Sequence, residues 1–303
     1  VRACASTPGF DPENVSASLN APDSPLVNRA FQAYAVGSVF KPMLAAAALE
    51  AGKTGLVWDC PGYCVVDGQV FRCAGGVPHG EVNLAAALQK RCNGYFIRLG
   101  QELGPERVRE MAVRLGFGRA LNLADTLSTA AGQLPEAETL TSSGAFANFC
   151  FGQGELLATP IQIAAMMNTI AAGGIWREPL FLECTLDETT GESLTALAHR
   201  GARRVFSAQT ARALRELLAS VVTEGTGHEA APTEGTAAGK TGTAQTGQFA
   251  AGKELKNYWF AGFYPARNPR YTIVVLQDGQ TGPSRTSAAI FARVCDALDA
   301  AGE

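Results

Sequence analysis

The chain has 303 residues, enough for one large domain or two small ones, and its composition is globular, with 47% apolar and 17% charged residues. A net charge of -3 argues against a nucleic-acid partner, which would require a basic surface. No apolar run is as long as a membrane span. Eight cysteines are too few for a dense disulfide framework at this length, so their spacing is more informative than their number.

The first predicted element is a strand over residues 1–7, which we expect to pair with a sheet formed late in the chain. A polar loop then leads to a short helix that is apolar nearly all round and stops at Gly52. Because it has no polar face, it should be the central buried helix. An irregular excursion with several cysteines and a hairpin-like turn follows over residues 58–80.

Helices alternate with loops through the middle of the chain, and strands dominate its end. Helices are predicted at 84–90, 95–103, 105–116, 159–173, 207–224 and 288–300, and loops at 117–158. Strands are predicted at 236–246, 258–264 and 271–276. The fold class is therefore α/β (α+β), an antiparallel sheet flanked by helices with an all-helical subdomain. We expect one domain over 1–303, with a sheet-rich lobe at about 1–35 and 200–303 and a mainly helical lobe at about 36–199.

The first catalytic candidate is Ser38, which precedes Lys41 by three residues at the start of the predicted buried helix. This spacing puts both side chains on one helix face, close enough to share a proton. A serine hydroxyl needs an adjacent base to act as a nucleophile. A lysine serves as that base once burial or a nearby cation lowers its pKa. Because Ser-x-x-Lys is common in chains of this length, it needs further support.

The second candidate is the run Lys240-Thr241-Gly242-Thr243 on a predicted strand. Strand alternation puts Lys240 and Gly242 on one face and the two threonines on the other. A lysine and threonine hydroxyls suit a carboxylate, and Gly242 is expected to leave space for a ligand against the strand edge. The alternative is a surface strand with a solvated lysine.

The third candidate is Arg91-Cys92-Asn93, in a break between two helices. We expect Asn93 to accept a hydrogen bond from Lys41 and to donate to a substrate amide. Taken alone, this signal is weak.

In this order, the three motifs are typical of penicillin-binding proteins and serine β-lactamases. Further segments agree with the first group: Ala5-Ser6-Thr7-Pro8-Gly9-Phe10-Asp11-Pro12, Asn28-Arg29-Ala30, Cys60-Pro61-Gly62, Gly152-Gln153-Gly154-Glu155 and Trp259-Phe260-Ala261-Gly262-Phe263. Over essentially its whole length, the chain resembles the transpeptidase domain of class B penicillin-binding proteins, the peptidoglycan D,D-transpeptidases.

The resemblance implies that Ser38 is the nucleophile, acylated by a peptidoglycan stem peptide that ends in D-Ala-D-Ala, and that Lys41 is its base. Asn93 would position Lys41 and the peptide amide. The terminal carboxylate would be bound by the late motif, Lys240, Thr241, Gly242 and Thr243, and β-lactams would acylate the same serine. The backbone N–H groups of Ser38 and Thr243 would form the oxyanion hole, and no cofactor is implied for catalysis.

Arg91 departs from the family pattern, in which a serine usually holds this position and relays a proton. A guanidinium stays charged and cannot act as that relay. Either Arg91 points away and reduced activity remains, or it belongs to the substrate-binding site and transpeptidation is weak. An Arg91→Ser change is predicted to raise the acylation rate.

Three alternatives to a transpeptidase stay open. A non-catalytic cell-wall scaffold is favoured only by Arg91. A serine β-lactamase would need a group that activates water, and no convincing Glu-x-x-x-Asn loop lies between the middle motif and Lys240. A β-lactam sensor is the third. The deacylation rate would distinguish a β-lactamase from a sensor or a transpeptidase.

A possible metal site lies beside the middle motif. Three thiols and an imidazole, Cys60, Cys73, His79 and Cys92, would make a tetrahedral structural Zn²⁺ site. Some elongation-type class B proteins are similar at these positions. A disulfide or reduced buried thiols are the alternatives, and Cys64 is a spare ligand.

The resemblance also implies partners and a location. Class B proteins usually carry a membrane anchor and a pedestal before this domain, so we expect an excised fragment from the extracytoplasmic face of a bacterial membrane. A separate glycosyltransferase would be its partner.

Overall fold

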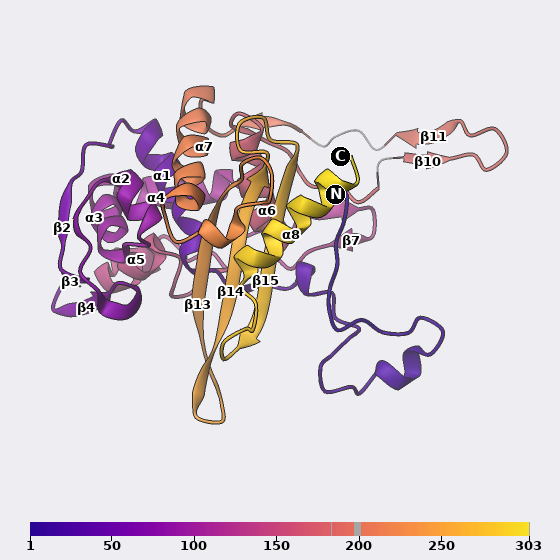
Figure 1. Ribbon diagram of the computed structural model, residues 1–303, viewed down its shortest axis with the longest axis horizontal. Helices are drawn as coiled ribbons and strands as arrows, with labels where there is room; N and C mark the ends of the chain where they lie inside the picture. The colour runs from indigo at the N-terminus through magenta and orange to yellow at the C-terminus, as the bar shows by residue number, and fades with distance from the viewer. Residues whose placement is uncertain (183, 197–200, 303) are drawn as a thin grey trace.

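The structure is a computed structural model that describes residues 1–182, 184–196 and 201–302. Its centre is a three-stranded antiparallel sheet in the order β13-β14-β15, with helices on both faces and a helical region to one side (Figure 1). The α-helices are α1 (Lys41–Glu50), α2 (Leu84–Gln89), α3 (Asn93–Leu103), α4 (Pro105–Arg114), α5 (Ser143–Cys150), α6 (Pro160–Ala171), α7 (Ala208–Thr223) and α8 (Ser287–Ala300). The strands are β1 (Tyr34–Ala35), β2 (Trp58–Cys60), β3 (Tyr63–Val66), β4 (Gln69–Arg72), β5 (Gly80–Val82), β6 (Asn122–Ala124), β7 (Leu127–Ser128), β8 (Leu157–Ala158), β9 (Ile175–Trp176), β10 (Cys184–Leu186), β11 (Ser193–Ala196), β12 (Arg203–Arg204), β13 (Ala238–Ala250), β14 (Lys253–Tyr264) and β15 (Tyr271–Gln280).

Strand alternation divides the core into two layers. On one face of β14, Phe260 and Tyr264 belong to the cluster formed with α8, and the Phe260 and Phe291 rings lie 4.7 Å apart. On the other face, Trp259, Ala261 and Phe263 belong to the large core shared with the other helices. The antiparallel sheet flanked by helices confirms the predicted fold class.

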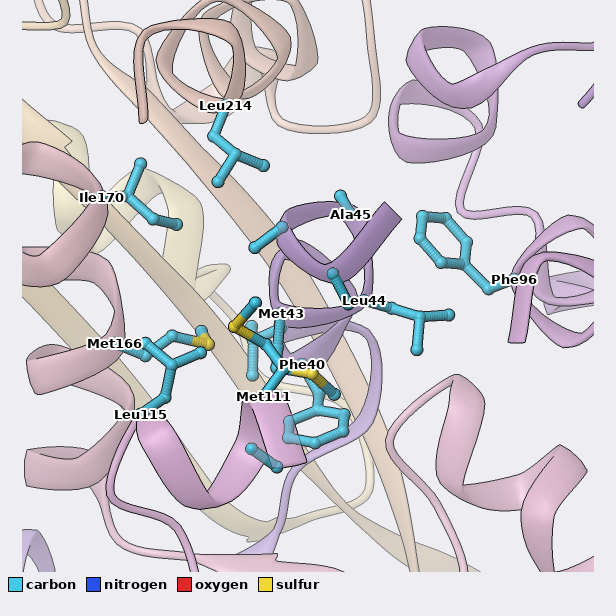
Figure 2. Packing of buried hydrophobic residues seen from close by; sticks show 14 of the residues in the cluster. Phe40, Met43, Leu44, Ala45, Phe96, Met111, Leu115, Met166, Ile170 and Leu214 are labelled. Carbon is cyan, nitrogen blue, oxygen red and sulfur yellow. The ribbon is translucent and has the colours of Figure 1, made fainter. Parts of the chain in front are cut away.

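Helix α1 is the centre of the large core, as its all-apolar sequence predicts. Figure 2 shows Met43, Leu44 and Ala45 surrounded by side chains of four other helices. Those neighbours are Phe96 of α3, Met111 of α4, Met166 and Ile170 of α6, and Leu214 of α7. Burial on every side makes this helix, and the serine just before it, a rigid base for a site.

Side-chain caps hold three helix starts in place. Asn83 accepts a hydrogen bond from the N–H of Ala86 at the start of α2, and Ser207 accepts one from Thr210 at the start of α7. Thr159 and Gln162 form a reciprocal capping box at the start of α6. These polar side chains satisfy backbone donors that a helix start leaves open.

The predicted strand over residues 1–7 is wrong. The N-terminal amine of Val1 donates to the carbonyl of Leu180, and the Ser6 hydroxyl donates to the carbonyl of Val27. This segment therefore lies against loops and does not pair with the sheet. In the described part of the chain, β15 is an edge strand that pairs with β14 alone. The composition of so short a segment does not specify a partner strand.

Helix α5 lies in the region predicted to be loops. Its buried residues are Phe146, Ala147, Phe149 and Cys150. They are too few for a visible helical period, and the glycine and asparagine of α5 are poor helix formers. Packing against α3 therefore stabilises it more than its own sequence does. None of the helices in the described ranges is both long and apolar enough to cross a membrane.

Candidate active site

Ser38 lies in a 3-10 turn, η3 (Gly37–Phe40), that runs directly into α1. Its neighbour Gly37 has a φ of +65°, and a Cβ there would lie only 2.6 Å from the carbonyl oxygen of Thr243. Only a glycine allows this close contact. It brings the serine–lysine motif against the lysine–threonine motif of β13, which is far away in sequence.

Lys41 is fully buried and hydrogen-bonded. Its Nζ donates to Oδ1 of Asn93 at 2.8 Å and to the carbonyl of Arg91 at 3.2 Å, and it lies 5.2 Å from the centre of the Phe96 ring. Burial lowers the pKa of Lys41 to about 7, and the positive charge of Arg91 acts in the same direction. A neutral amine, which is the form a base needs, is therefore available near neutral pH.

Ser38 and Lys41 are one helical turn apart, but within the described residues no hydrogen bond joins their side chains. Ser38 is 7% exposed, whereas Lys41 has no exposed surface. Nucleophile and base contacts are often loose before a substrate binds.

Asn93 is the first residue of α3 and lies where the sequence predicts. Its side-chain oxygen accepts from Lys41, and its amide Nδ2 donates to the carbonyl of Arg72 on β4 at 2.9 Å. The helix start is fixed by Cys92, whose sulfur accepts from the N–H of Tyr95. Asn93 thus links Lys41 to the hairpin of the cysteine-bearing excursion.

Arg91 points into the site and not away from it. Its Nη2 donates to Oγ1 of Thr243 at 3.0 Å, across the gap between the α2–α3 break and β13. The Arg91 side chain therefore belongs to the site, which is the second of the two possibilities given by the sequence.

Burial along β13 follows the predicted alternation. Lys240 and Gly242 are buried, whereas Thr241 and Thr243 are partly exposed on the opposite face. Nζ of Lys240 lies 3.4 Å from the Thr241 hydroxyl, which in turn lies 3.4 Å from the hydroxyl of Thr226. Burial lowers the pKa of Lys240 well below its usual value, and the nearby charges of Lys41 and Arg91 lower it further.

The expected role of Gly242 needs a correction. A Cβ at this position would lie 2.8 Å from a methyl of Val39 and 3.2 Å from the carbonyl of Val36. The glycine therefore makes room for the turn that carries Ser38, not for a ligand at the strand edge.

Gly152 supports the site without having been assigned a role from the sequence. Its carbonyl accepts from the N–H of Gly37 at 2.7 Å, and its φ of +84° is favoured by glycine. A Cβ on Gly152 would lie 2.1 Å from the carbonyl oxygen of Gly37. The signal was the Gly152-Gln153-Gly154 spacing, which indicates a tight turn but not which segment it contacts.

Cys60, Cys73, His79 and Cys92 form a compact cluster whose ligand atoms all lie within 4.8 Å of one another. The three sulfur–sulfur distances are 3.4, 3.7 and 3.9 Å, and Sγ of Cys60 lies 3.5 Å from Nδ1 of His79. Sulfurs at the corners of a tetrahedron with Zn–S bonds of about 2.3 Å would be ~3.8 Å apart. The donor set and its spacing therefore fit a zinc ion.

The cluster contacts the middle motif directly. The thiol of Cys92 and the N–H groups of Gly94 and Asn93 donate to the sulfur of Cys73, and these hydrogen bonds lower the pKa of Cys73 to about 5. Cys64 lies outside the cluster, packed with Ile97 in a separate apolar group, so it is not a spare ligand. All eight cysteines are free thiols.

Comparison with known proteins agrees with this geometry. Residues 1–296 match the family model of the penicillin-binding protein transpeptidase domain. The chain belongs to this family. The transpeptidase domain is 32% identical over 299 residues to stage V sporulation protein D of Bacillus subtilis, covering 96% of the chain and 45% of that protein. It is 31% identical over 336 residues to the peptidoglycan D,D-transpeptidase PbpA of Mycolicibacterium smegmatis, covering 99% of the chain and 64% of that protein.

Solved structures of the family superpose on the transpeptidase domain. The D,D-transpeptidase domain of a peptidoglycan glycosyltransferase from Eggerthella lenta matches with a TM-score of 0.86 and 28% identity, covering 98% of this chain and 74% of that one. Penicillin-binding protein 3 of Mycobacterium tuberculosis, complexed with aztreonam, matches with a TM-score of 0.81 and 30% identity. The match covers 93% of this chain and 66% of that one. The transpeptidase domain spans about half the length of the curated relatives it matches.

Proposed function

We propose that this transpeptidase domain cross-links peptidoglycan stem peptides through an acyl-serine intermediate on Ser38. The observation that carries this proposal is the environment of Lys41, a fully buried amine one helical turn from Ser38 and hydrogen-bonded to Asn93. This amine has its pKa lowered to about 7, as a general base for a serine requires. Relatives named peptidoglycan D,D-transpeptidases support the reaction class.

The reaction has two acyl transfers. Lys41 takes the hydroxyl proton of Ser38 as Oγ attacks the carbonyl of the penultimate D-alanine. The C–N bond to the terminal D-alanine then breaks, and that residue leaves with the proton as a free amine. An amine of a neighbouring strand attacks the resulting ester, forms the cross-linking amide and returns a proton to Ser38. The backbone N–H groups of Ser38 and Thr243 are the expected oxyanion donors.

Intact-mass spectrometry with benzylpenicillin tests the acyl-serine. We expect a single persistent adduct on the parent domain and none on Ser38→Ala. Rapid loss of the adduct would favour a β-lactamase, and absence of any adduct would favour a non-catalytic scaffold. A matched control is Ser143→Ala, which changes a serine in α5, outside the site.

We further propose a structural Zn²⁺ held by Cys60, Cys73, His79 and Cys92. Four protein ligands leave no open position for a substrate, so the ion would be structural and not catalytic. It would fix the start of α3, where Asn93 lies one residue after the ligand Cys92. Metal analysis of protein purified without chelator should give one zinc per chain; a disulfide-bonded protein without zinc would exclude the site.

The location and partners are inferred from the family. Cell-wall synthesis takes place outside the cytoplasm, and solved relatives include complexes with ampicillin and aztreonam. We therefore propose an extracytoplasmic enzyme that β-lactams acylate. A membrane anchor and a separate glycosyltransferase stay predictions.

A further inference from the structure

The backbone of Arg91 has a conformation that its side chain does not favour. Its φ is +60°, in the left-handed region that glycine adopts most readily. It follows the end of α2, where the N–H of Cys92 bonds to the carbonyl of Ala87 in the manner of a Schellman motif. Glycine is the usual residue at such a position. An arginine kept there has a conformational cost, which suggests that its side chain has a function.

The guanidinium is only partly satisfied by the protein. Nη2 donates to Thr243, but the Nε is buried and has no hydrogen-bond partner within the described residues. A buried donor without an acceptor is unfavourable, more so on a charged group. An acceptor on a ligand would remove this cost.

Two lysines, Lys41 and Lys240, lie close to Arg91. Lys41 donates to the carbonyl of Arg91, and the charges of Lys41 and Arg91 both act on Lys240. Within the described ranges, no carboxylate forms an ion pair with Arg91 or with either of these lysines. A buried guanidinium without an acidic partner is a favourable place for an anion.

Arg91 also determines how Thr243 can bond. The Nη2–H of the Arg91 guanidinium occupies a lone pair of the Thr243 hydroxyl oxygen, so the hydroxyl proton is free to be donated to a ligand. The guanidinium and this hydroxyl therefore present donors side by side. Two donors at this spacing match the two oxygens of a carboxylate.

We propose that Arg91 is a specificity-determining residue that binds, together with Thr243, the carboxylate next to the scissile amide of the ligand. This carboxylate is the C-terminus of the donor peptide or its equivalent in a β-lactam. The role rests on the acylation of Ser38 proposed above. It differs from that of a serine at this position, which can relay a proton but carries no charge to recognise an anion.

The test compares benzylpenicillin with its methyl ester, which lacks the charge. The second-order rate constant of acylation is measured for both by intact mass, and the acid-to-ester ratio is calculated for each variant. Loss of a charged hydrogen bond predicts that Arg91→Gln lowers this ratio roughly tenfold or more, while Arg91→Lys retains part of it. Changes in the pKa of Lys41 affect both ligands and cancel in the ratio.

Two further variants separate binding from chemistry. Arg91→Ser should lower the ratio as Arg91→Gln does, although its reaction with the ester should become faster because the proton relay returns. Arg107→Gln removes an exposed arginine of α4 and should leave the ratio unchanged. An unchanged ratio in Arg91→Gln would overturn the carboxylate role.

Binding to the Ser38→Ala variant gives a readout that needs no acylation. Saturation-transfer NMR should show preferential binding of the acid over the ester, and Ser38→Ala/Arg91→Gln should lose that preference. If the parent domain is never acylated but this preference is present, the transpeptidase proposal fails and the carboxylate site stands. Equal binding of acid and ester to both variants overturns the carboxylate site.

Discussion

Lys41 is suited to act as a base because its buried environment lowers its pKa, which is too high in an exposed lysine. A lysine in water has a pKa of about 10.4 and is charged at neutral pH. Here the side chain has no exposed surface, and the Arg91 charge disfavours a second cation beside it. The cost of burying the ammonium keeps the amine neutral for part of the time near pH 7.

The pH dependence of acylation should report this lysine. The neutral form is active, so the second-order rate constant for benzylpenicillin should rise with pH through about 7 and become level above it. Arg91→Gln should move the inflection to higher pH because it removes a neighbouring positive charge. The measurement is a competition assay with a fluorescent penicillin at a series of pH values. An inflection above about pH 9 would show that the pKa of Lys41 is not lowered.

At the scale of elements, the turn that carries Ser38 is held by backbone contacts on two sides. Gly37 touches the carbonyl of Thr243 on β13, and Gly152 touches Gly37 from the loop after α5. Neither contact leaves room for a side chain. The position of Ser38 thus depends on two glycines as well as on the apolar faces of α1.

Gly152→Ala should destabilise the domain by about 3 kcal/mol, because it adds an overlap to the cost of a left-handed alanine. Acylation of the remaining folded protein should also be slower, since the turn at Ser38 must shift. Gly247→Ala is the matched control: its φ is +69°, but no atom lies within 4 Å of the new Cβ.

Urea unfolding measures both variants. The free energy of unfolding of Gly247→Ala should fall by only about 1 kcal/mol, which is the cost of a left-handed backbone conformation for alanine. Equal losses in the two variants would mean that the contact between Gly152 and Gly37 does not hold the turn.

At the scale of the whole molecule, the Cys/His cluster connects segments that have no continuous sheet between them. Cys60 lies on β2, Cys73 just after β4, His79 just before β5 and Cys92 at the start of α3. The small sheets here have two strands each, which are weakly stable by themselves. A metal ion would hold them together and would support Lys41 through Asn93.

Removal of the metal should therefore affect both stability and chemistry. A strong chelator, or Cys73→Ser, is expected to lower the Tm and to slow acylation by benzylpenicillin, and added zinc should restore the chelated sample. Cys64→Ser is the control, because that thiol is buried outside the cluster. Unchanged Tm and acylation after complete metal removal would contradict a structural role.

Local sequence patterns determined much of this protein. Side-chain caps at Asn83, Thr159 and Ser207 mark helix starts, since each satisfies donors within its own first turn. The faces of Lys240 and Thr241 follow from strand alternation alone. The order of the three motifs also indicated the family, because their residue types suit one chemistry.

Only the tertiary structure decided the features that depend on distant neighbours. The direction of the Arg91 side chain is set by Thr243, and the need for Gly242 by Val39, neither of which a local pattern reveals. The segment over 1–7 was predicted to be a strand but lies against loops, because a strand needs a partner edge that local sequence does not specify. The depressed pKa of Lys41 likewise comes from burial, and burial is a property of how the packed elements exclude water.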